Sequence, residues 1–133
     1  MFDSRVSKQQ LVFVIEDTSG NKFGIYIDAE IEKFNSSHND PNSFNFSLKS
    51  NGRINEMKKF NITDSRNGLY LCDESSGYLF WNGHYDITVS KKGLSGSRIR
   101  QSSFNYEGIQ NALTGSPYNS CFTPKRIVVI QMK

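Results

Sequence analysis

Long apolar runs are absent from this sequence of 133 residues. No stretch approaches the roughly 18 apolar residues of a membrane-spanning helix, and the first ten residues are too polar for a secretion signal. Cysteine is scarce as well, since Cys72 and Cys121 are the only two. Two cysteines do not make a disulfide scaffold. The sequence therefore predicts one domain over residues 1–133, intracellular and cytoplasmic, monomeric, with an apolar core of its own. Whether the two thiols respond to oxidants stays open.

Histidine is also rare, which limits the catalytic arrangements that the chain can offer. Acid–base and nucleophilic catalysis most often use a histidine, and only His38 and His84 are present. Cys72, His84 and Asp86 can be written as a nucleophile arrangement, but no local motif supports it. A lone cysteine in a strand is usually a small buried hydrophobe. The prediction is that the protein is not an enzyme, with a Cys72-based enzyme as the weakest of three hypotheses.

Metal-binding and phosphate-binding motifs are missing too. The cysteines and histidines lack the paired spacing of zinc ligands. No glycine-rich loop leads into Lys and Ser/Thr, and no dinucleotide fingerprint is found. The sequence therefore predicts neither a metal nor a cofactor.

Acidic residues are nearly absent from the last third of the chain, where Glu107 is the only one after Asp86. Residues 1–67 carry equal numbers of acids and bases, so the formal net charge of +3 arises later in the chain. The predicted partner-binding residues are the bases of the 91–100 loop: Lys91, Lys92, Arg98 and Arg100. A basic loop suits an acidic partner, whereas the alternative interpretation is an ordinary solvated face.

Interleaved aromatic and basic residues also raise a nucleic-acid hypothesis, with Trp81, Tyr85 and Phe104 as base-stacking side chains beside the 91–100 loop. In a β protein such aromatics more often belong to the core.

A second hypothesis concerns Ser103, which follows Arg98 and Arg100 at a spacing that basophilic kinases recognise. Phosphate there would place up to about two negative charges among these bases.

Ten Phe, six Tyr and one Trp exclude a disordered chain, and the pattern of apolar residues predicts strands. Phe44, Phe46 and Leu48 alternate with polar residues and are predicted to face the core. Residues 11–15 read as a strand buried on both faces, and residues 126–130 as a central closing strand. The other strands are expected over residues 22–27, 58–62, 68–72, 78–81 and 85–89. A short helix is expected between Phe104 and Leu113 and a helical turn over residues 28–32. Short strands at this spacing indicate an antiparallel sandwich or barrel.

The order of these segments resembles the TLDc domain family. The similar segments are Phe2-Asp3-Ser4, the hairpin from Phe13 to Phe23-Gly24, Ser43-Phe44-Asn45-Phe46-Ser47-Leu48, residues 83–104, and residues 113–130. Two departures stand out. The helical part that the family usually has at its N-terminus is shortened here to residues 5–10 or absent, and Val128 occupies a position that is commonly acidic in the family.

The resemblance implies a mostly β fold, a two-sheet sandwich with one or two short helices, and no established catalytic activity. It also implies a protein-interaction module, since family members are linked to protection against oxidative damage and to binding the vacuolar proton-pumping ATPase. The leading hypothesis is therefore a non-enzymatic protein-binding domain. The alternative is a nucleic-acid-binding regulator that uses the basic 91–100 loop.

Overall fold

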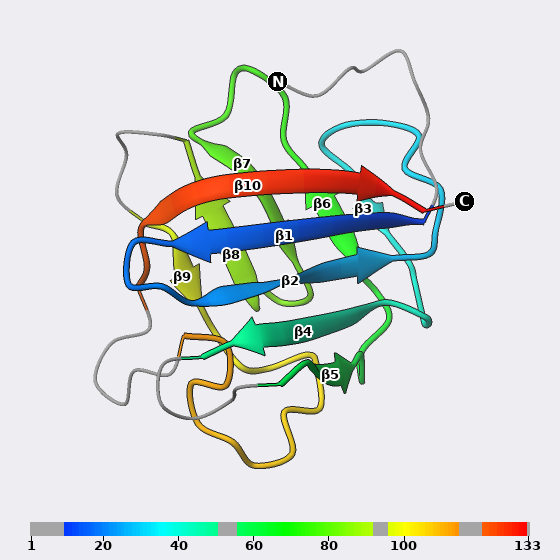
Figure 1. Ribbon diagram of the computed structural model, residues 1–133. Coiled ribbons are helices and arrows are strands. Elements are labelled where there is room, and N and C mark those ends of the chain that lie inside the picture. Colours follow the sequence, from blue (N-terminus) through cyan, green and yellow to red (C-terminus); the bar gives the residue numbers. More distant parts are fainter. Residues whose placement is uncertain (1–9, 51–55, 92–95, 115–120, 133) are drawn as a thin grey trace.

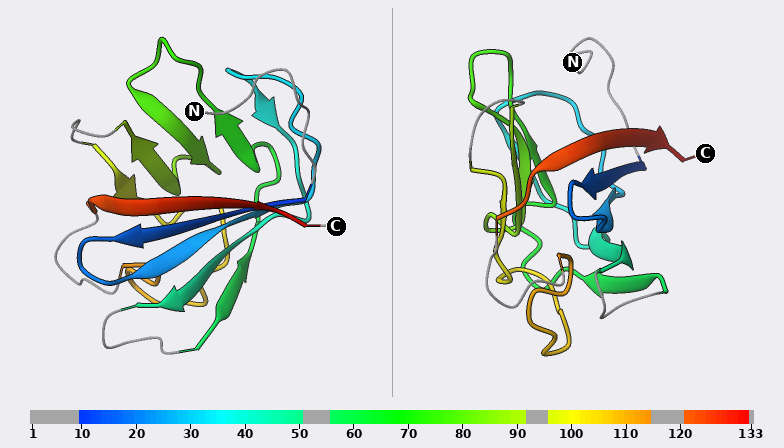
Figure 2. Two further views of the ribbon diagram at one scale, coloured as in Figure 1. Left: turned by 45° about the horizontal axis from the view of Figure 1, so that its top comes forward. Right: turned by 60° about the vertical axis from the view of Figure 1, so that its left-hand side comes forward.

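Two antiparallel sheets of five strands each stack face to face (Figure 1; Figure 2, right). The computed structural model describes residues 10–50, 56–91, 96–114 and 121–132. The first sheet has the order β10-β1-β2-β4-β5, with strands Pro124–Gln131, Leu11–Asp17, Lys22–Ile27, Phe44–Lys49 and Lys58–Asn61. The second has the order β3-β6-β7-β8-β9, with strands Ser37–His38, Leu69–Leu71, Tyr78–Asn82, Ile87–Ser90 and Arg98–Ile99. The predicted two-sheet β-sandwich is confirmed.

The core lies between the sheets. Phe13, Ile25 and Phe23 of the first sheet are fully buried, as are Phe80 and Ile87 of the second. The rings of Phe13 and Phe80 meet across the interface with their centroids 5.0 Å apart. The predicted hairpin is confirmed, because β1 and β2 pair in register from Leu11↔Ile27 to Glu16↔Lys22.

The predicted helix between residues 104 and 113 is wrong, since the described residues contain no helix. Phe104 instead pairs with Ile62 in an isolated bridge, and the chain then makes successive turns. Glu107, Gly108 and Asn111 all have positive φ angles, which a right-handed helix does not accept. Residues 28–32 likewise form no helical turn.

The prediction for β4 has the right strand but the wrong face. Asn45 and Ser47 are fully buried toward the core, opposite Ile25 and Phe23 of β2. Phe44 and Phe46 lie on the outer face of the first sheet, where Phe44 stacks on Tyr26 at 4.8 Å. The inward amide of Asn45 belongs to a network that joins both sheets: the Asn82 amide donates to Asn45 Oδ1 at 2.6 Å, and the Asn45 amide donates to the Tyr106 hydroxyl at 3.0 Å. The buried hydroxyl of Ser47 has no hydrogen-bond partner among the described residues.

The two most apolar strands also differ from their predictions. β10 is an edge strand that pairs only with β1, and Val128, Val129 and Ile130 are each at least 40% exposed. β1 buries alternate residues and leaves Val12 and Val14 half-buried, so it is not covered on both faces. A wholly apolar strand was expected to be central because exposing such a surface is unfavourable.

Candidate functional site

The outer face of the second sheet carries one row of side chains that crosses all five strands. The strand register places Ser37 beside Tyr70, Tyr70 beside Trp81, Trp81 beside Thr88, and Thr88 beside Arg98. Residues that are directly paired in a sheet point to the same face, so the row is continuous. It is aromatic in the middle and basic at the β9 edge.

Four aromatic residues gather on this face, and we call them the aromatic cluster: Tyr70, Tyr78, Trp81 and Tyr85. Tyr70 stacks on Trp81 with centroids 4.1 Å apart and planes 9° apart. Tyr78 meets Trp81 edge-on at 6.2 Å, and Tyr85 lies tilted at 5.3 Å. Tyr78 and Tyr85 are 42% and 45% exposed, so the cluster presents a substantial apolar surface to solvent.

Tyr85 is held in a conformation that a bulky residue rarely adopts. Its φ angle is +66°, in the left-handed region, which costs an L-residue roughly 1–2 kcal/mol. Such strain persists only where the surrounding structure fixes the backbone, and it is concentrated at functional sites. Here the strain does not bury the ring. It keeps an aromatic side chain exposed beside Trp81.

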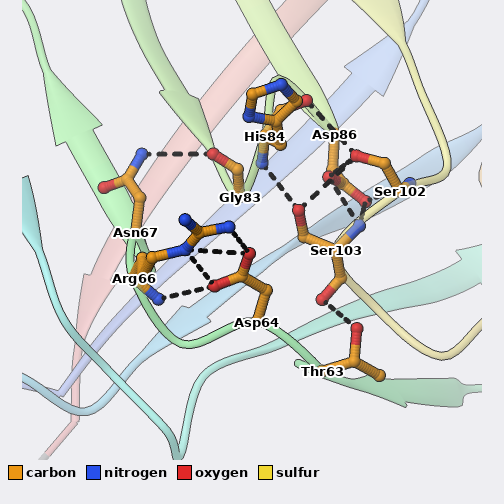
Figure 3. Close-up of polar contacts among 9 residues, drawn as sticks. All are labelled: Thr63, Asp64, Arg66, Asn67, Gly83, His84, Asp86, Ser102 and Ser103. Atoms are coloured by element: carbon orange, nitrogen blue, oxygen red, sulfur yellow. Dashed lines mark hydrogen bonds and ion pairs between the residues drawn. The ribbon is translucent and has the colours of Figure 1, made fainter.

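Hydrogen bonds of His84 and Asp86, the neighbours of Tyr85 in the chain, fix the turn that presents this residue; Figure 3 shows those that His84 and Asp86 form with Ser102 and Ser103. The carboxylate of Asp86, fully buried, accepts bonds from the main-chain N–H groups of Ser102 and Ser103 at 3.0–3.1 Å. It also accepts from the hydroxyl of Tyr106 at 2.8 Å. The N–H of His84 donates to Ser103 Oγ at 2.8 Å. The residues on either side of Tyr85 are therefore tied to the segment 102–106.

The Tyr106 hydroxyl is the donor in this network. Burial, followed by the neighbouring Asp86 carboxylate, raises the pKa of Tyr106 well above its ordinary value. The phenol therefore stays protonated at neutral pH and donates to Asp86 while it accepts from Asn45. The turn under Tyr85 is thus linked through Tyr106 to the first sheet.

Two cavities open beside the aromatic cluster, and Trp81 and Tyr85 line both. One, of about 390 Å³, also includes Asp64, Arg66 and His84. The other, of about 480 Å³, lies toward the β9 edge and is lined in addition by Ser76, Tyr78, Thr88, Gly96, Arg98 and Arg100. We call the second one the β9-edge cavity.

The predicted basic residues are only partly brought together. Arg98 and Arg100 are both exposed and both line the β9-edge cavity. Lys91 points elsewhere, because its ammonium group donates to the carbonyl of Glu74 at 2.6 Å. Lys92 lies outside the described residues. The site therefore rests on the two arginines, and partner binding at these residues stays a prediction.

Arg66 differs from these two arginines because its charge is neutralised. Its Nε donates to both carboxylate oxygens of Asp64, at 2.9 and 3.1 Å. These bonds lower the pKa of Asp64 to about 2. The positive charge beside the aromatic cluster is therefore concentrated at the β9 edge and not at Arg66.

This ion pair gives a prediction for the pH dependence of the Asp64 carboxyl group. In Arg66→Ala the pKa of Asp64 is expected to rise from about 2 toward its usual range, because the donor is lost. In the native protein the pair contributes stability above the unfolded-state pKa, and that contribution is lost as the pH falls toward 2. A carboxyl-carbon NMR titration measures it. Asp73, whose pKa is lowered by Ser75 and Asn35, is the internal control and should not change.

Ser103, the predicted phosphorylation site, is 2% exposed and its hydroxyl accepts the His84 bond. A kinase can reach this hydroxyl only after the segment opens. Its phosphorylation stays a prediction, with that added requirement.

Cys72 and His84 are kept apart by the pairing of β6 with β7. The N–H of Cys72 bonds to Leu79 at one end of the pair, whereas Gly83 bonds to Asn67 beyond the other end. Leu79 and Gly83 are four residues apart along the chain, which corresponds to about 13 Å at about 3.3 Å per residue. Burial also raises the pKa of the Cys72 thiol. The Asp86 carboxylate is bonded to Ser102, Ser103 and Tyr106. The geometry does not bring the hypothetical nucleophile arrangement together.

Within the described residues, no group of three or more His, Cys, Asp or Glu side chains is arranged to hold a metal ion. The same part of the chain includes no helix of the length and apolarity needed to cross a membrane.

Comparison with family models matches the TLDc domain over residues 1–126. The chain belongs to the TLDc domain family. Comparisons with curated proteins and with solved structures find no significant match. The matched range stops before Val128, so it does not bear on the departure at that residue.

Two sequence motifs of this TLDc domain meet in space. Gly24, from the Phe-Gly hairpin, pairs with Phe46, from the Phe-Asn-Phe-Ser-Leu strand. A side chain at Gly24 would begin 2.6 Å from Cζ of Phe46, so the phenyl ring occupies the space that a Cβ would need. The carbonyl oxygen of Phe13 would lie closer still, at 1.9 Å, and because it belongs to the backbone it is the contact that requires glycine at this position.

Trp81, Tyr85 and Phe104 were predicted to act together as base-stacking side chains, but the structure separates them. Phe104 is a core residue, whereas Tyr85 is exposed and Trp81 is half-buried. Tyr70 and Tyr78 were not identified as site residues. For Tyr70 the available signal was the alternation Leu69-Tyr70-Leu71 beside Phe80-Trp81-Asn82, which places Tyr70 and Trp81 on the face opposite the leucines. Tyr78 is three residues from Trp81, and an irregularity of the pairing between Tyr78 and Phe80 lies between them, so alternation alone does not place it there.

Proposed function

We propose that this TLDc domain is a non-enzymatic, intracellular protein-binding module that acts as a monomer. The family link to the vacuolar proton-pumping ATPase and to oxidative-stress resistance suggests that ATPase as the partner. Family membership supports an interaction role, and the proposed binding face is the outer face of the second sheet.

The observation that carries this assignment is Tyr85. A fold that only needed a turn between β7 and β8 would gain stability from glycine at a φ angle of +66°. The chain instead keeps an exposed tyrosine there, next to Trp81 and above buried hydrogen bonds that hold the turn. Tyrosine, tryptophan and arginine are the residues that dominate binding energy at protein interfaces. The aromatic cluster and the two arginines supply all three.

Tyr85→Gly tests the proposal because it should separate binding from stability. Relief of left-handed strain, about 1–2 kcal/mol, offsets the lost ring contact with Trp81, about 0.5–1.5 kcal/mol. The free energy of unfolding is therefore expected to stay within about 1 kcal/mol of the wild-type value. Binding to purified vacuolar ATPase, measured by biolayer interferometry with and without peroxide, is expected to weaken at least about tenfold.

Val129→Ala is the matched control, because Val129 is 42% exposed on β10, in the other sheet. Its affinity should equal that of the wild type. Equal binding by Tyr85→Gly contradicts the assignment to this face. No binding by the wild-type chain contradicts the choice of partner.

A further inference from the structure

We propose that the β9-edge cavity and its two arginines bind an extended acidic segment of a protein partner, with acidic side chains at alternate positions. This inference rests on the proposed function, because it names the chemistry of the partner at the same face. Three features support it: the spacing of the arginines, the lack of a carboxylate partner for either arginine among the described residues, and the lining of the cavity.

Arg98 and Arg100 point to the same side of the chain. Ile99, between them, is buried at 4% exposure in the core, and Ile87 is its partner in β8. Side chains alternate across a strand, so burial of Ile99 directs both neighbours outward. The N–H of Arg100 donates to the carbonyl of Asp86 at 2.8 Å, which fixes the backbone beside the Tyr85 turn. Two residues of extended chain span about 6.6–6.8 Å, so a partner strand with acids at alternate positions has the same repeat.

Neither guanidinium group forms an ion pair with a carboxylate of the described residues. Arg66, by contrast, is bound to Asp64. Arginine presents planar donors that match a carboxylate at two points, and such charge-assisted bonds are roughly twice as strong as neutral ones. The pair is therefore available for an acidic ligand.

The cavity beside the arginines offers an apolar wall and a further polar group. Tyr78, Trp81 and Tyr85 line it on the side of the aromatic cluster. Thr88, between Trp81 and Arg98 in the cross-strand row, is 6% exposed, and its hydroxyl has no hydrogen-bond partner within the described structure. That oxygen is itself buried, so the exposed guanidinium groups of Arg98 and Arg100 are the groups that a carboxylate would reach first. The cavity thus suits an apolar side chain flanked by carboxylates.

The aromatic cluster favours a protein segment over a single-stranded nucleic acid. Base stacking needs a free ring face. Tyr70 covers one face of Trp81 at 4.1 Å, and Tyr85 and Tyr78 contact the same ring. Three neighbouring rings therefore pack against Trp81 and compete with a base for its faces, which favours apolar side chains over bases as ligands.

Trp81 is the only tryptophan in the chain, so its fluorescence reports directly on this site. We would titrate the protein with four probes of eight units: a peptide with glutamates at alternate positions and one leucine, its glutamine counterpart, its phosphoserine counterpart, and oligo-dT. The glutamate peptide is expected to shift the Trp81 emission and to bind at least about tenfold more tightly than the glutamine peptide, since two charge-assisted bonds are lost in the latter.

Arg98→Ala/Arg100→Ala should lose that preference. Lys33→Ala/Lys125→Ala, which removes the same charge from exposed residues elsewhere, should keep it. Equal affinity for the glutamate and glutamine peptides overturns the inference, as does tighter binding of the phosphoserine peptide or of oligo-dT than of the glutamate peptide. It is also overturned if no probe shifts the Trp81 emission, or if both double variants lose the preference for glutamate equally. Binding to the vacuolar ATPase distinguishes this inference from the proposed function. If Tyr85→Gly loses that binding while Arg98→Ala/Arg100→Ala keeps it, the proposed function stands and this inference fails.

Discussion

Gly24→Ala is expected to destabilise the protein by more than about 4 kcal/mol, an exceptionally large effect for the addition of one methyl group. Gly24 lies in the interior of the first sheet, paired with Val14 on one side and Phe46 on the other. An added Cβ would lie 1.9 Å from the carbonyl oxygen of Phe13 and 2.6 Å from the ring of Phe46. The first contact is with backbone and cannot be relieved by a side-chain rotation, so the pairing of β1 with β2 must shift. Urea unfolding measures the loss.

Gly108→Ala is the matched control for this substitution. It adds the same methyl group at a position with nothing within 4 Å, where only the φ angle of +78° opposes it. Its expected cost is about 1–2 kcal/mol. The explanation is wrong if the two variants lose similar stability, or if Gly24→Ala unfolds at the wild-type urea concentration.

Asp86→Ala is expected to cost about 3–5 kcal/mol and to weaken partner binding as well. The substitution leaves the buried N–H of Ser103 and the hydroxyl of Tyr106 without their acceptor. Hydrogen bonds to a charged group contribute about 1.5–3 kcal/mol each, and the orphaned donors stay buried. The bonds from Ser102, Ser103 and Tyr106 to Asp86 also hold the segment 102–106 against the turn of Tyr85, so the ring loses part of its support.

Asp73→Ala provides the comparison for Asp86. Asp73 accepts bonds from Ser75 and Asn35 in an exposed turn, so its loss is expected to lower the stability far less than the loss of Asp86 does. Thermal unfolding of both variants, with partner binding measured well below each midpoint, separates loss of the turn from loss of the whole fold. Unchanged stability in Asp86→Ala would contradict the role given to the buried carboxylate.

The strands were largely predictable because alternation and turn residues are local signals. Which face of a strand is buried depends on residues that are distant in sequence, as β4 shows. Alternation in its sequence places Phe44 and Phe46 on one face of the strand and Asn45 and Ser47 on the other. The polar side faces the core because Asn82 and Tyr106, 37 and 61 residues away in sequence, hydrogen-bond to Asn45. Partners that distant cannot be identified from one sequence.

The candidate site was predictable only in part for a related reason. Arg98 and Arg100 can be recognised in the sequence by their charge. The residues of the aromatic cluster cannot, because aromatic residues in a β protein are usually buried in the core. Its exposure follows from the register Tyr70↔Trp81 and from the left-handed turn at Tyr85. A tyrosine with a positive φ angle is rare enough that no turn rule predicts it. β10 was predicted to be central because it is apolar, but it lies at the edge of the first sheet. Apolar composition does not show whether a strand has one neighbour or two.

The central claim is that the outer face of the second sheet binds the partner, and hydrogen–deuterium exchange of the complex with the vacuolar ATPase tests it most directly. The account predicts slower amide exchange in residues 78–90 and 98–100 on binding. Exchange in β10, the other exposed apolar surface, should be unchanged. Protection confined to β10, with no change around Tyr85 and Arg98, would contradict the account.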